Sequence, residues 1–459
     1  DTYQVNYSFR MDAGMPEHPW EYFLQMIRAQ GEKTLGAYID TGDWCICSAS
    51  PELFFSLNGN KLTSRPMKGT RKRGLWSVDD KEAAQWLLNS SKNRAENVMI
   101  VDMVRNDLSR IAHKNTVAVE RLFELEKYNP LWQLTSTVSC QTSTGIADIF
   151  KALFPASSIT GAPKTNTMGI IQELETSPRD IYTGSIGYVG PGRQAQFNVA
   201  IRTVWMDIKQ RTSHYGVGGG IVWDSSGHEE LQECKTKAKV LNEYTPDFSL
   251  LETLLWEPQL GYFLLQKHIN RLLASAEYFD FKKSIDAAVL RQQLQEKARH
   301  FKNAAHKVRL TVPKTDPLQG IEIQAQPVHK WKGPYYIAFA YSPVDNSSPF
   351  LYHKTTYRRV YEQARERVAG VDDVLLYNDK GEVTESCIAN VVAQFGNDLL
   401  TPPIKSGLLD GVFRHHLLDE ARIKEQVLTP DDILRCDKLY LINSVRKWWE
   451  PVLLNNRGG

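Results

Sequence analysis

Carboxylates and a lysine recur at helical spacing near the middle of the chain. Glu230, Glu233 and Lys237 are separated by three and four residues, so one face of a helix presents all three side chains. Glu96 opens another predicted helix. Carboxylates gathered from two helices form an oxygen-rich site that suits Mg²⁺, a metal that keeps waters and grips a substrate carboxylate or phosphate. Spacing alone favours the simpler interpretation, a solvated helix face with an i,i+4 ion pair.

A second candidate for chemistry is a lysine in the stretch RPMKGTRKRG, residues 65–74. Lys68 stands between a proline-led bend and a Gly-Thr step, directly after a predicted strand. A lysine amine is nucleophilic only when it is neutral, and burial beside cations such as Arg65 and Arg71 lowers its pKa. The segment therefore predicts a reactive amine or, as for most such clusters, a solvated turn.

Two further features favour anion binding. The segment GVGGG, residues 216–220, lets backbone N–H groups approach an anion closely. Glycines after a strand are nevertheless more often a bulge or a tight turn. Arg202, late in the predicted strand FNVAIRT, could clamp a carboxylate in bidentate fashion, and its alternative is a surface arginine.

The C-terminal half carries a different set of residues. Lys354 precedes a helical pattern, Glu385 lies on a predicted strand with Asn390 downstream, and Arg271 lies on a helix face. The stretch SGLLDGVFR is a glycine-containing turn that enters a helix, an arrangement suited to a phosphate. A pyridoxal phosphate site needs such a lysine, carboxylate and anion clamp. Each residue alone is more often structural, but their order together indicates this site.

These residues depend on the elements that position them. Residues 35–67 have the pattern of short strands joined by turns, with an Asn58-Gly59 hairpin signal. Amphipathic patterns predict helices at 79–92 and 94–111. Strand patterns return at TVAVERL, GSIGYVG, QFNVAIRTVWM and SHYGVGGGIVW, and the last leads into a helix at 228–241. The first part is therefore predicted to be α+β with a large antiparallel component.

The pattern changes at the stretch NEYTPDFSLLET, where a Thr-Pro-Asp step ends the preceding helix. We therefore expect two domains, residues 1–243 and 249–459, joined by a linker at 244–248. Beyond the linker, residues 265–281 form a strongly amphipathic helical pattern. Strand patterns follow at AAHKVRLTV, DDVLLYN and VTESCIANVVAQF.

The composition is that of an ordinary globular chain. It has 459 residues, 42% hydrophobic and 24% charged, and its net charge is only +2. Nothing global therefore favours nucleic acid or a membrane surface as a partner. The six cysteines include no CxxC pair, and no apolar run is long enough to span a bilayer. We expect a reduced, cytoplasmic compartment.

Seven motifs occur in order within residues 1–243: SPELF, RPMKGTRKRG, ENVMIVDMVRNDLSRI, ITGAPK, YTGSIGYVG, FNVAIRT and GVGGGIVWDSSGHEELQECKTKAK. Together they resemble the chorismate-utilising enzymes, which include anthranilate synthase, aminodeoxychorismate synthase, and the isochorismate and salicylate synthases. The resemblance implies an α+β fold with an antiparallel two-sheet chorismate-binding domain. It begins well inside the usual domain, and Asp1 lies within a predicted strand, so we expect this domain to be truncated at its N-terminus.

The resemblance also implies roles for single residues. Glu96, Glu230 and Glu233 fall where the family binds Mg²⁺, which holds the ring carboxylate of chorismate. The residues implied to bind the substrate are Thr160, Gly161, Tyr188, Arg202, Gly218, Gly219, Gly220 and Lys237. Of these, Arg202, the glycine backbone and Lys237 fall where the carboxylates of the substrate would be bound.

The residue at position 68 separates two branches of the family. Members that make anthranilate resemble PIAGT, aminodeoxychorismate synthases resemble PIKGT, and this chain has PMKGT. By that resemblance Lys68 attacks C2 of chorismate and expels the 4-hydroxyl, after which ammonia adds at C4 and displaces the lysine. Glu52 of SPELF stands where a general acid would help the hydroxyl leave. Gln133 stands where relatives often have histidine; it can still hydrogen-bond that hydroxyl but carries no proton at neutral pH.

Residues 249–452 resemble a second family, the fold-type IV pyridoxal phosphate enzymes. This family includes branched-chain and D-amino-acid transaminases and 4-amino-4-deoxychorismate lyase, and the stretch NSVRKWWEP looks more like the lyase branch. The resemblance implies a two-subdomain α+β fold in which Lys354 attaches the cofactor and Glu385 keeps its ring nitrogen protonated. The residues implied to hold the phosphate are Arg271, Gly411, Val412 and Ser444.

The two resemblances imply consecutive reactions. The first domain would aminate chorismate to 4-amino-4-deoxychorismate, and the second would eliminate pyruvate to give 4-aminobenzoate, a folate precursor. No glutaminase signature is visible, so we expect ammonia from a separate glutamine amidotransferase subunit, and we expect a homodimer through the C-terminal half. The alternatives are an anthranilate-type synthase fused to a transaminase, which Lys68 disfavours, and a partly inactive scaffold that docks an amidotransferase.

Overall fold

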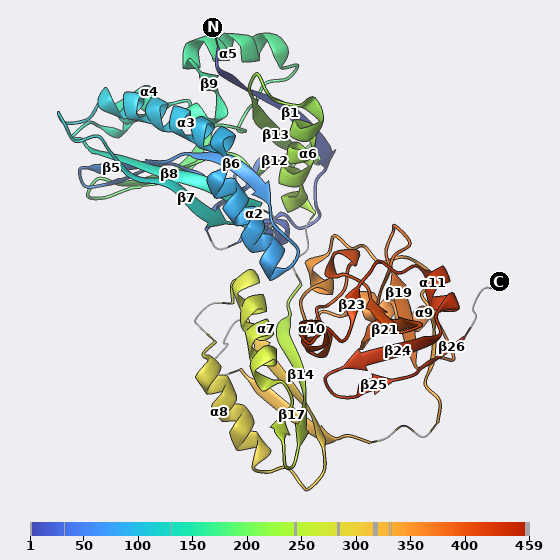
Figure 1. The fold of residues 1–459 in the computed structure, drawn as a ribbon. Helices are drawn as coiled ribbons and strands as arrows, with labels where there is room; N and C mark the ends of the chain where they lie inside the picture. Colours follow the sequence, from blue (N-terminus) through green and yellow to red (C-terminus); the bar gives the residue numbers. More distant parts are fainter. Residues whose placement is uncertain are drawn as a thin grey trace. The chain divides into compact units, whose positions relative to one another are not determined.

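The computed structural model describes residues 2–31, 33–129, 131–242, 246–281, 285–314, 320–329, 331 and 333–454. The chain forms two compact units, residues 1–74 with 81–245, and residues 75–80 with 246–459 (Figure 1). Of the predicted linker at 244–248, residues 244 and 245 lie outside the described residues, and 246–248 belong to no helix or strand. Within the described residues, no helix is long and apolar enough to cross a membrane.

The first unit is built on two antiparallel sheets, as predicted. The six-stranded sheet runs in the order β2 (Leu35–Asp40), β3 (Trp44–Ser50), β12 (Thr203–Asp207), β13 (Thr212–Ile221), β1 (Gln4–Gly14), β9 (Gly161–Ala162). The seven-stranded sheet runs β10 (Ser185–Gly190), β11 (Gln194–Val199), β4 (Leu53–Asn58), β5 (Lys61–Arg65), β8 (Leu131–Gln141), β6 (Met67–Lys72), with β7 (Ala118–Lys127) paired to β8.

Helices complete a separate core for each sheet of this unit. The α-helices described in the N-terminal half are α1 (Pro19–Gln30), α2 (Ser77–Asn89), α3 (Ser91–Ser109), α4 (Ile146–Leu153), α5 (Lys164–Leu174) and α6 (Gly227–Ala238). Apolar residues of α3 and α4 pack with β4, β5, β8 and β11, and those of α1 and α6 pack with β3, β12 and β13. Helix α3 begins at Ser91 because the side chain of Ser90 accepts a hydrogen bond from the Asn93 N–H.

The predicted strand QFNVAIRTVWM is wrong as a single element. It divides into β11 and β12, which belong to different sheets, and Arg202 lies between them in the left-handed conformation at φ +50°. Alternation alone did not reveal the break, because apolar residues stand on both sides of it, at 199–201 before and at Val204 after. Lys68 lies on strand β6, so the alternative interpretation of this segment as a solvated turn is wrong. The glycines 216–220 lie on strand β13, as the predicted strand SHYGVGGGIVW implied.

The second unit has two subdomains. The smaller one is an antiparallel sheet in the order β15 (Gly261–Tyr262), β14 (Ser249–Glu257), β16 (His306–Pro313), β17 (Glu322–Pro327), packed with α7 (Leu265–Tyr278) and α8 (Ala287–Ala298). Figure 1 shows both helices running along this sheet. The alternating apolar residues of β16, Val308, Leu310 and Val312, face α7 and α8 in the core.

The larger subdomain is a mixed nine-stranded sheet with helices α9 (Arg359–Arg367), α10 (Val412–Asp419) and α11 (Pro430–Arg435). The strands are β18 (Tyr336–Phe339), β19 (Asp373–Tyr377), β20 (Val383–Ser386), β21 (Asn390–Phe395), β22 (Asp398–Thr401), β23 (Lys424–Glu425), β24 (Lys438–Asn443), β25 (Lys447–Trp449) and β26 (Val452–Leu453). The predicted strand VTESCIANVVAQF is thus two antiparallel strands, and their register sets Glu385 opposite Asn390.

Backbone bonds join the two subdomains beside Lys354. The Leu251 N–H donates to the Lys354 carbonyl oxygen at 3.0 Å, and the Thr356 N–H donates to the Ser249 carbonyl oxygen at 2.9 Å. Strand β14 of the smaller subdomain therefore holds the lysine-bearing segment of the larger one in place.

Candidate functional sites

The first candidate site gathers around Lys68 on strand β6. Its amine nitrogen lies 2.5 Å from the point that a Cβ atom on Gly220 would occupy, so only a glycine leaves room for it. Burial lowers the pKa of the Lys68 amine, and the neighbouring cation Lys237 acts in the same direction, while Glu96 opposes both. The arrangement favours a neutral, nucleophilic amine.

The glycine segment of β13 is packed closely on both sides. A Cβ atom on Gly218 would collide with the Tyr7 carbonyl oxygen of β1, and one on Gly219 would lie 3.0 Å from Glu230 Oε2. Lys237 Nζ donates to the Gly218 carbonyl oxygen at 2.9 Å and pairs with Glu233 at 2.8 Å. The i,i+4 ion pair on α6 is therefore present, and it faces the glycine strand.

Three carboxylates from two helices interact at this place. Burial raises the pKa of Glu96, and the charges of Glu230 and Glu233 raise it further. For Glu233, burial would raise the pKa, but Lys237 outweighs it and the pKa is lowered. In the described part of the chain, no group of three or more His, Cys, Asp or Glu side chains is assembled closely enough to hold a metal ion. The donors are all carboxylate oxygens, the type that Mg²⁺ prefers, and the three side chains would have to close around the ion to bind it together.

Glu52 supplies a proton-carrying group beside the lysine. Its side chain is almost fully buried and accepts a hydrogen bond from the Met67 N–H at 3.4 Å. Burial raises the pKa of Glu52 to about 7, against the lowering influence of the Met67 N–H and the Lys68 charge. A carboxyl group with this pKa is partly protonated at neutral pH and can donate a proton.

The other predicted substrate residues have differing surroundings. Arg202 is buried, and its guanidinium donates to the side-chain oxygen of Gln30. Thr160 and Gly161 are buried against strand β1. The carbonyl oxygen of Thr160 accepts a hydrogen bond from the Asn6 N–H at 2.8 Å. Tyr188 is different, because it is 60% exposed on the edge strand β10.

The side-chain amide of Gln133 hydrogen-bonds a residue of the neighbouring strand. The side chain is buried on β8, and its Nε2 donates to Thr70 Oγ1 at 3.2 Å. This hydrogen bond joins strands β8 and β6.

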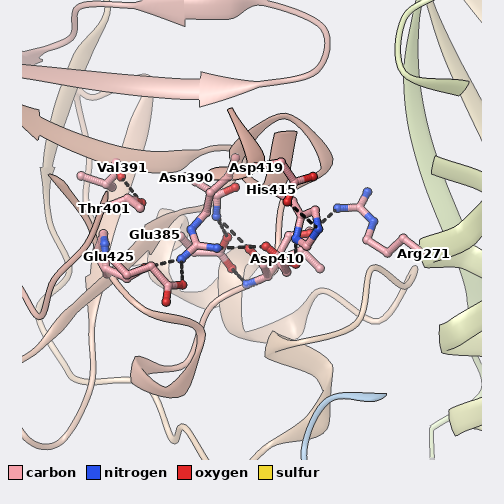
Figure 2. Close-up of polar contacts among 12 residues, drawn as sticks. Arg271, Glu385, Asn390, Val391, Thr401, Asp410, His415, Asp419 and Glu425 are labelled. Carbon is pink, nitrogen blue, oxygen red and sulfur yellow. Dashed lines mark hydrogen bonds and ion pairs between the residues drawn. The ribbon is translucent and has the colours of Figure 1, made fainter. Parts of the chain in front are cut away.

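The second candidate site is a cavity of about 530 Å³ in the second unit. All six residues predicted to bind the cofactor line it: Arg271, Lys354, Glu385, Gly411, Val412 and Ser444. Figure 2 shows Arg271 reaching from α7 towards Asp410, and Glu385 lying beside Asn390. The structure therefore brings this predicted set together.

Lys354 and Glu385 both titrate near neutrality. Burial lowers the pKa of Lys354 to about 7, and Arg271 adds to the effect. Burial raises the pKa of Glu385 to about 7, although Tyr361 Oη donates to its Oε1 at 2.7 Å. Asn390 Nδ2 donates to the other carboxylate oxygen at 3.3 Å. The carboxylate is thus fixed in orientation on the cavity wall.

An anion-binding corner lies at the start of α10. Arg271 is held by Glu252, with Nη2 and Oε2 2.7 Å apart, and its Nη1 donates to the Asp410 carbonyl oxygen at 3.0 Å. Gly411 precedes α10, and a Cβ atom there would collide with Asn390 Oδ1. A helix N-terminus beside an arginine favours a phosphate. With the lysine and the carboxylate, the residues fit pyridoxal phosphate.

Comparison with known proteins decides the family. Residues 1–243 match the family described as chorismate binding enzyme. This chain belongs to the chorismate-binding enzyme family. Residues 249–452 of this chorismate-binding protein match the family described as amino-transferase class IV. The predicted two-domain organisation, with a chorismate-binding first half and a class IV aminotransferase-like second half, is confirmed.

Relatives of the chorismate-binding half have two names. The protein is 39% identical over 240 residues to aminodeoxychorismate synthase component 1 of Bacillus subtilis, covering 52% of this chain and 50% of the relative. It is 39% identical over 243 residues to anthranilate synthase component 1 of Aquifex aeolicus, covering 52% and 49%. The chain spans about half the length of these curated relatives.

A solved structure resembles the C-terminal half. It is that of a putative 4-amino-4-deoxychorismate lyase from Legionella pneumophila, with a TM-score of 0.41 and 21% identity. The match covers 46% of this chain and 84% of the other.

Sequence reasoning missed several residues of both sites. Gln4 in the first unit is buried beside Gly220, and its only signal was the alternation of polar residues in TYQVNYSFR. In the second unit, Tyr361 and His268 line the cavity. His268 lies three residues before Arg271, so helical spacing could have placed it on the same face.

Proposed function

We propose that the protein makes 4-aminobenzoate from chorismate in two steps. The first unit aminates chorismate to 4-amino-4-deoxychorismate, and the second eliminates pyruvate from that product. The Lys68 amine carries this proposal, because its burial favours the neutral form and it adjoins both the glycine strand and the carboxylate group. The name of the Bacillus subtilis relative, aminodeoxychorismate synthase component 1, also supports it.

In the first step, the neutral Lys68 amine forms a bond to C2 of chorismate. Both ring double bonds shift, and the bond from C4 to its hydroxyl oxygen breaks. Glu52 supplies the proton with which this oxygen leaves as water, consistent with a pKa of about 7. Ammonia then bonds to C4, both double bonds shift back, and the lysine leaves C2.

Charges of the first site would bind the carboxylates of chorismate. Glu96, Glu230 and Glu233 would hold Mg²⁺, which supplies positive charge for the ring carboxylate. Arg202, Lys237 and the backbone of Gly218, Gly219 and Gly220 would contact the carboxylates, with Thr160, Gly161 and Tyr188 as further substrate residues. Arg202 is buried and Lys237 is partly buried, which strengthens such contacts, since charges interact more strongly away from water.

In the second step, pyridoxal phosphate supplies an electron sink for the substrate. Lys354 would attach the cofactor and, once released, remove the C4 proton. Glu385 would bind the cofactor ring nitrogen, and Arg271, Gly411, Val412 and Ser444 would bind its phosphate. Pyruvate leaves from C3, and formation of the aromatic ring makes the step favourable.

The mouth of the second cavity suits a substrate with carboxylates. Lys307, Arg309 and Arg446 line it, and the pKa of Lys307 is lowered by burial and by its two arginine neighbours. Bound carboxylates would offset this repulsion between cations. The proposed intermediate carries two carboxylates.

We also propose the partners and the compartment. A glutamine amidotransferase subunit would supply ammonia, as the name "component 1" of the relatives implies a second component. The C-terminal half would form a homodimer. Free thiols at all six cysteines suit a reducing cytoplasm.

The second candidate function is anthranilate synthesis, favoured by the Aquifex aeolicus relative. Product identity separates the two. The full chain is incubated with chorismate, Mg²⁺, pyridoxal phosphate and ammonium at alkaline pH, and the aromatic product is identified by mass and fluorescence. We expect 4-aminobenzoate, and anthranilate would overturn the proposal.

A further inference from the structure

Strand β6 contains a bulge at Lys68. The register of β6 against β8 shifts between Met67 and Thr70. Two residues of β6, Lys68 and Gly69, therefore stand opposite one residue of β8, Leu134. Gly69 has a φ of +95°, a conformation that favours glycine. A bulge turns side chains away from the direction that regular alternation gives them, so the direction of the Lys68 side chain depends on it.

The side chain of Asn97, on helix α3, bonds both strands at this bulge. Its Nδ2 donates to the carbonyl oxygen of Lys68 at 3.3 Å and to that of Leu134 at 3.3 Å. An amide nitrogen carries two hydrogens, so each bond has its own donor. A bulge disrupts the hydrogen bonds of a sheet locally, and here one amide supplies donors to a carbonyl group on either side.

The amide of Asn97 is held in one orientation. The residue is 1% exposed, and its Oδ1 accepts a hydrogen bond from Ser136 Oγ on β8. It lies on the buried face of α3, which also packs through apolar residues such as Ile100 and Val104. Burying a polar side chain among apolar ones is unfavourable unless hydrogen bonds satisfy it. The bonds to the bulge and to Ser136 therefore account for an asparagine at this position.

The Lys68 amine has little room to move. Its Nζ lies 2.5 Å from the point that a Cβ atom on Gly220 would occupy, so it lies close against strand β13. Glu96, a carboxylate of this site, directly precedes Asn97 on α3. One helix thus carries a candidate Mg²⁺ ligand and fixes the backbone of the candidate nucleophile. Rigid support of this kind keeps reacting groups at a productive distance.

We propose that Asn97 is a positioning residue for the amination step, whose amide holds the bulge of β6 against α3 and so aims the Lys68 amine at the ring of chorismate. This inference rests on the proposed function of the first unit. In this role Asn97 acts through Lys68 and contributes nothing to the affinity for chorismate, which the charged residues of the site supply. Its loss should therefore slow the attack by the amine and leave substrate binding unchanged.

The test separates the rate of attack from binding. The full chain is mixed with Mg²⁺ and increasing chorismate without ammonia and quenched at short times, and the Lys68 adduct is quantified by mass spectrometry. The dependence on chorismate concentration gives a maximal rate and a half-saturating concentration. The variants are Asn97→Leu, which keeps the approximate size without hydrogen bonds, and Asn106→Leu, an exposed asparagine of the same helix as matched control.

Thermal unfolding checks that each variant folds. Where Asn97→Leu does not fold, Ser136→Ala takes its place, since it removes the hydrogen bond that orients the amide. Ser136→Ala should lower the maximal rate by about threefold or more, because one buried hydrogen bond is lost while the bonds to the bulge remain possible.

Asn97→Leu should lower the maximal rate about 10- to 100-fold, the range expected when a reacting group is displaced by about 1 Å. The half-saturating concentration should stay within about twofold of that of the unsubstituted protein. Asn106→Leu should change neither. If a folded variant kept the maximal rate, or weakened chorismate binding by more than it slowed the attack, this inference alone would be overturned. If the unsubstituted protein formed no adduct, the proposed function would be overturned as well.

Discussion

Burial displaces the pKa values of the candidate catalytic groups towards neutrality. The pKa values of Glu52 and Glu385 are raised to about 7, that of Lys354 is lowered to about 7, and that of Lys68 is lowered. Groups that titrate near the working pH exchange protons most effectively, and perturbed groups gather at functional sites. At the residue scale, the two sites share one arrangement: a partly buried lysine with a buried carboxyl group nearby.

The pH dependence of the first step follows from Glu52. The carboxyl must be protonated to assist the leaving hydroxyl, so the active fraction falls as the pH rises through about 7. Where the Lys68 amine is already neutral, we expect the single-turnover rate of chorismate consumption, measured without ammonia, to fall by up to about tenfold per pH unit above that value. Glu52→Gln should lower the rate and remove this alkaline limb. If the Glu52→Gln variant kept the same fall in rate at high pH, another group would cause that fall.

Attachment of pyridoxal phosphate to Lys354 should show the opposite trend. The amine reacts when neutral, so the attachment rate should rise as the pH approaches about 7 and level off above it. Stopped-flow absorbance of the cofactor added to the apoprotein measures this rate. Lys354→Ala should give no attachment, whereas Lys424→Ala, an exposed lysine of β23, should react normally. If the attachment rate reached half its maximum only near pH 10, burial would not lower the pKa of Lys354.

At the scale of elements, the sites depend on where strands break and approach one another. The sheet-rich α+β fold of the first half was predictable from short alternating strands and turn signals. The division of residues 194–207 into β11 and β12 was not, because apolar residues continue on both sides of the break and no turn residue marks it. The left-handed Arg202 marks the crossing.

The two sites differed in how far the sequence revealed them. The cofactor residues of the second unit lie beside short motifs, and all six line one cavity. Gln4 was missed because an alternating polar strand is typical of a solvated face, and only the tertiary packing shows that this face is buried. Tyr188 was predicted from its motif, yet it is exposed on an edge strand.

The close approach of β13 to β6 predicts the effect of a single methyl group. Gly220→Ala would set a Cβ atom 2.5 Å from both Lys68 Nζ and Gln4 Nε2, so the lysine must move. We expect kcat/KM for amination to fall on the order of 10²-fold with little change in the unfolding temperature. Gly14→Ala, where no atom lies within 4 Å of the added Cβ, is the matched control. Full activity of Gly220→Ala would show that Lys68 does not work in this position.

At the scale of the whole molecule, the chain has two units, each with its own core and its own candidate site. No residue of the described cofactor cavity comes from the first unit. The two reactions should therefore be separable by point substitution.

Lys354→Ala should still consume chorismate with ammonium and accumulate 4-amino-4-deoxychorismate, because the first site is intact. Lys68→Ala should make no product from chorismate but should convert added 4-amino-4-deoxychorismate at the normal rate. Chromatography of both reactions checks this, with Lys114→Ala as an exposed-lysine control. Loss of both activities in either variant, with the fold intact, would contradict separate sites.

The most direct test of the central claim is a search for the covalent bond to Lys68. The protein is mixed with chorismate and Mg²⁺ without ammonia, quenched and digested, and the peptides are analysed by mass spectrometry. We predict a peptide containing Lys68 that is heavier by chorismate less one water, and that disappears when ammonium is added before the quench. The account would be contradicted if the protein formed 4-aminobenzoate without ever carrying this adduct. It would also be contradicted if the Lys68→Ala variant formed 4-aminobenzoate at an undiminished rate.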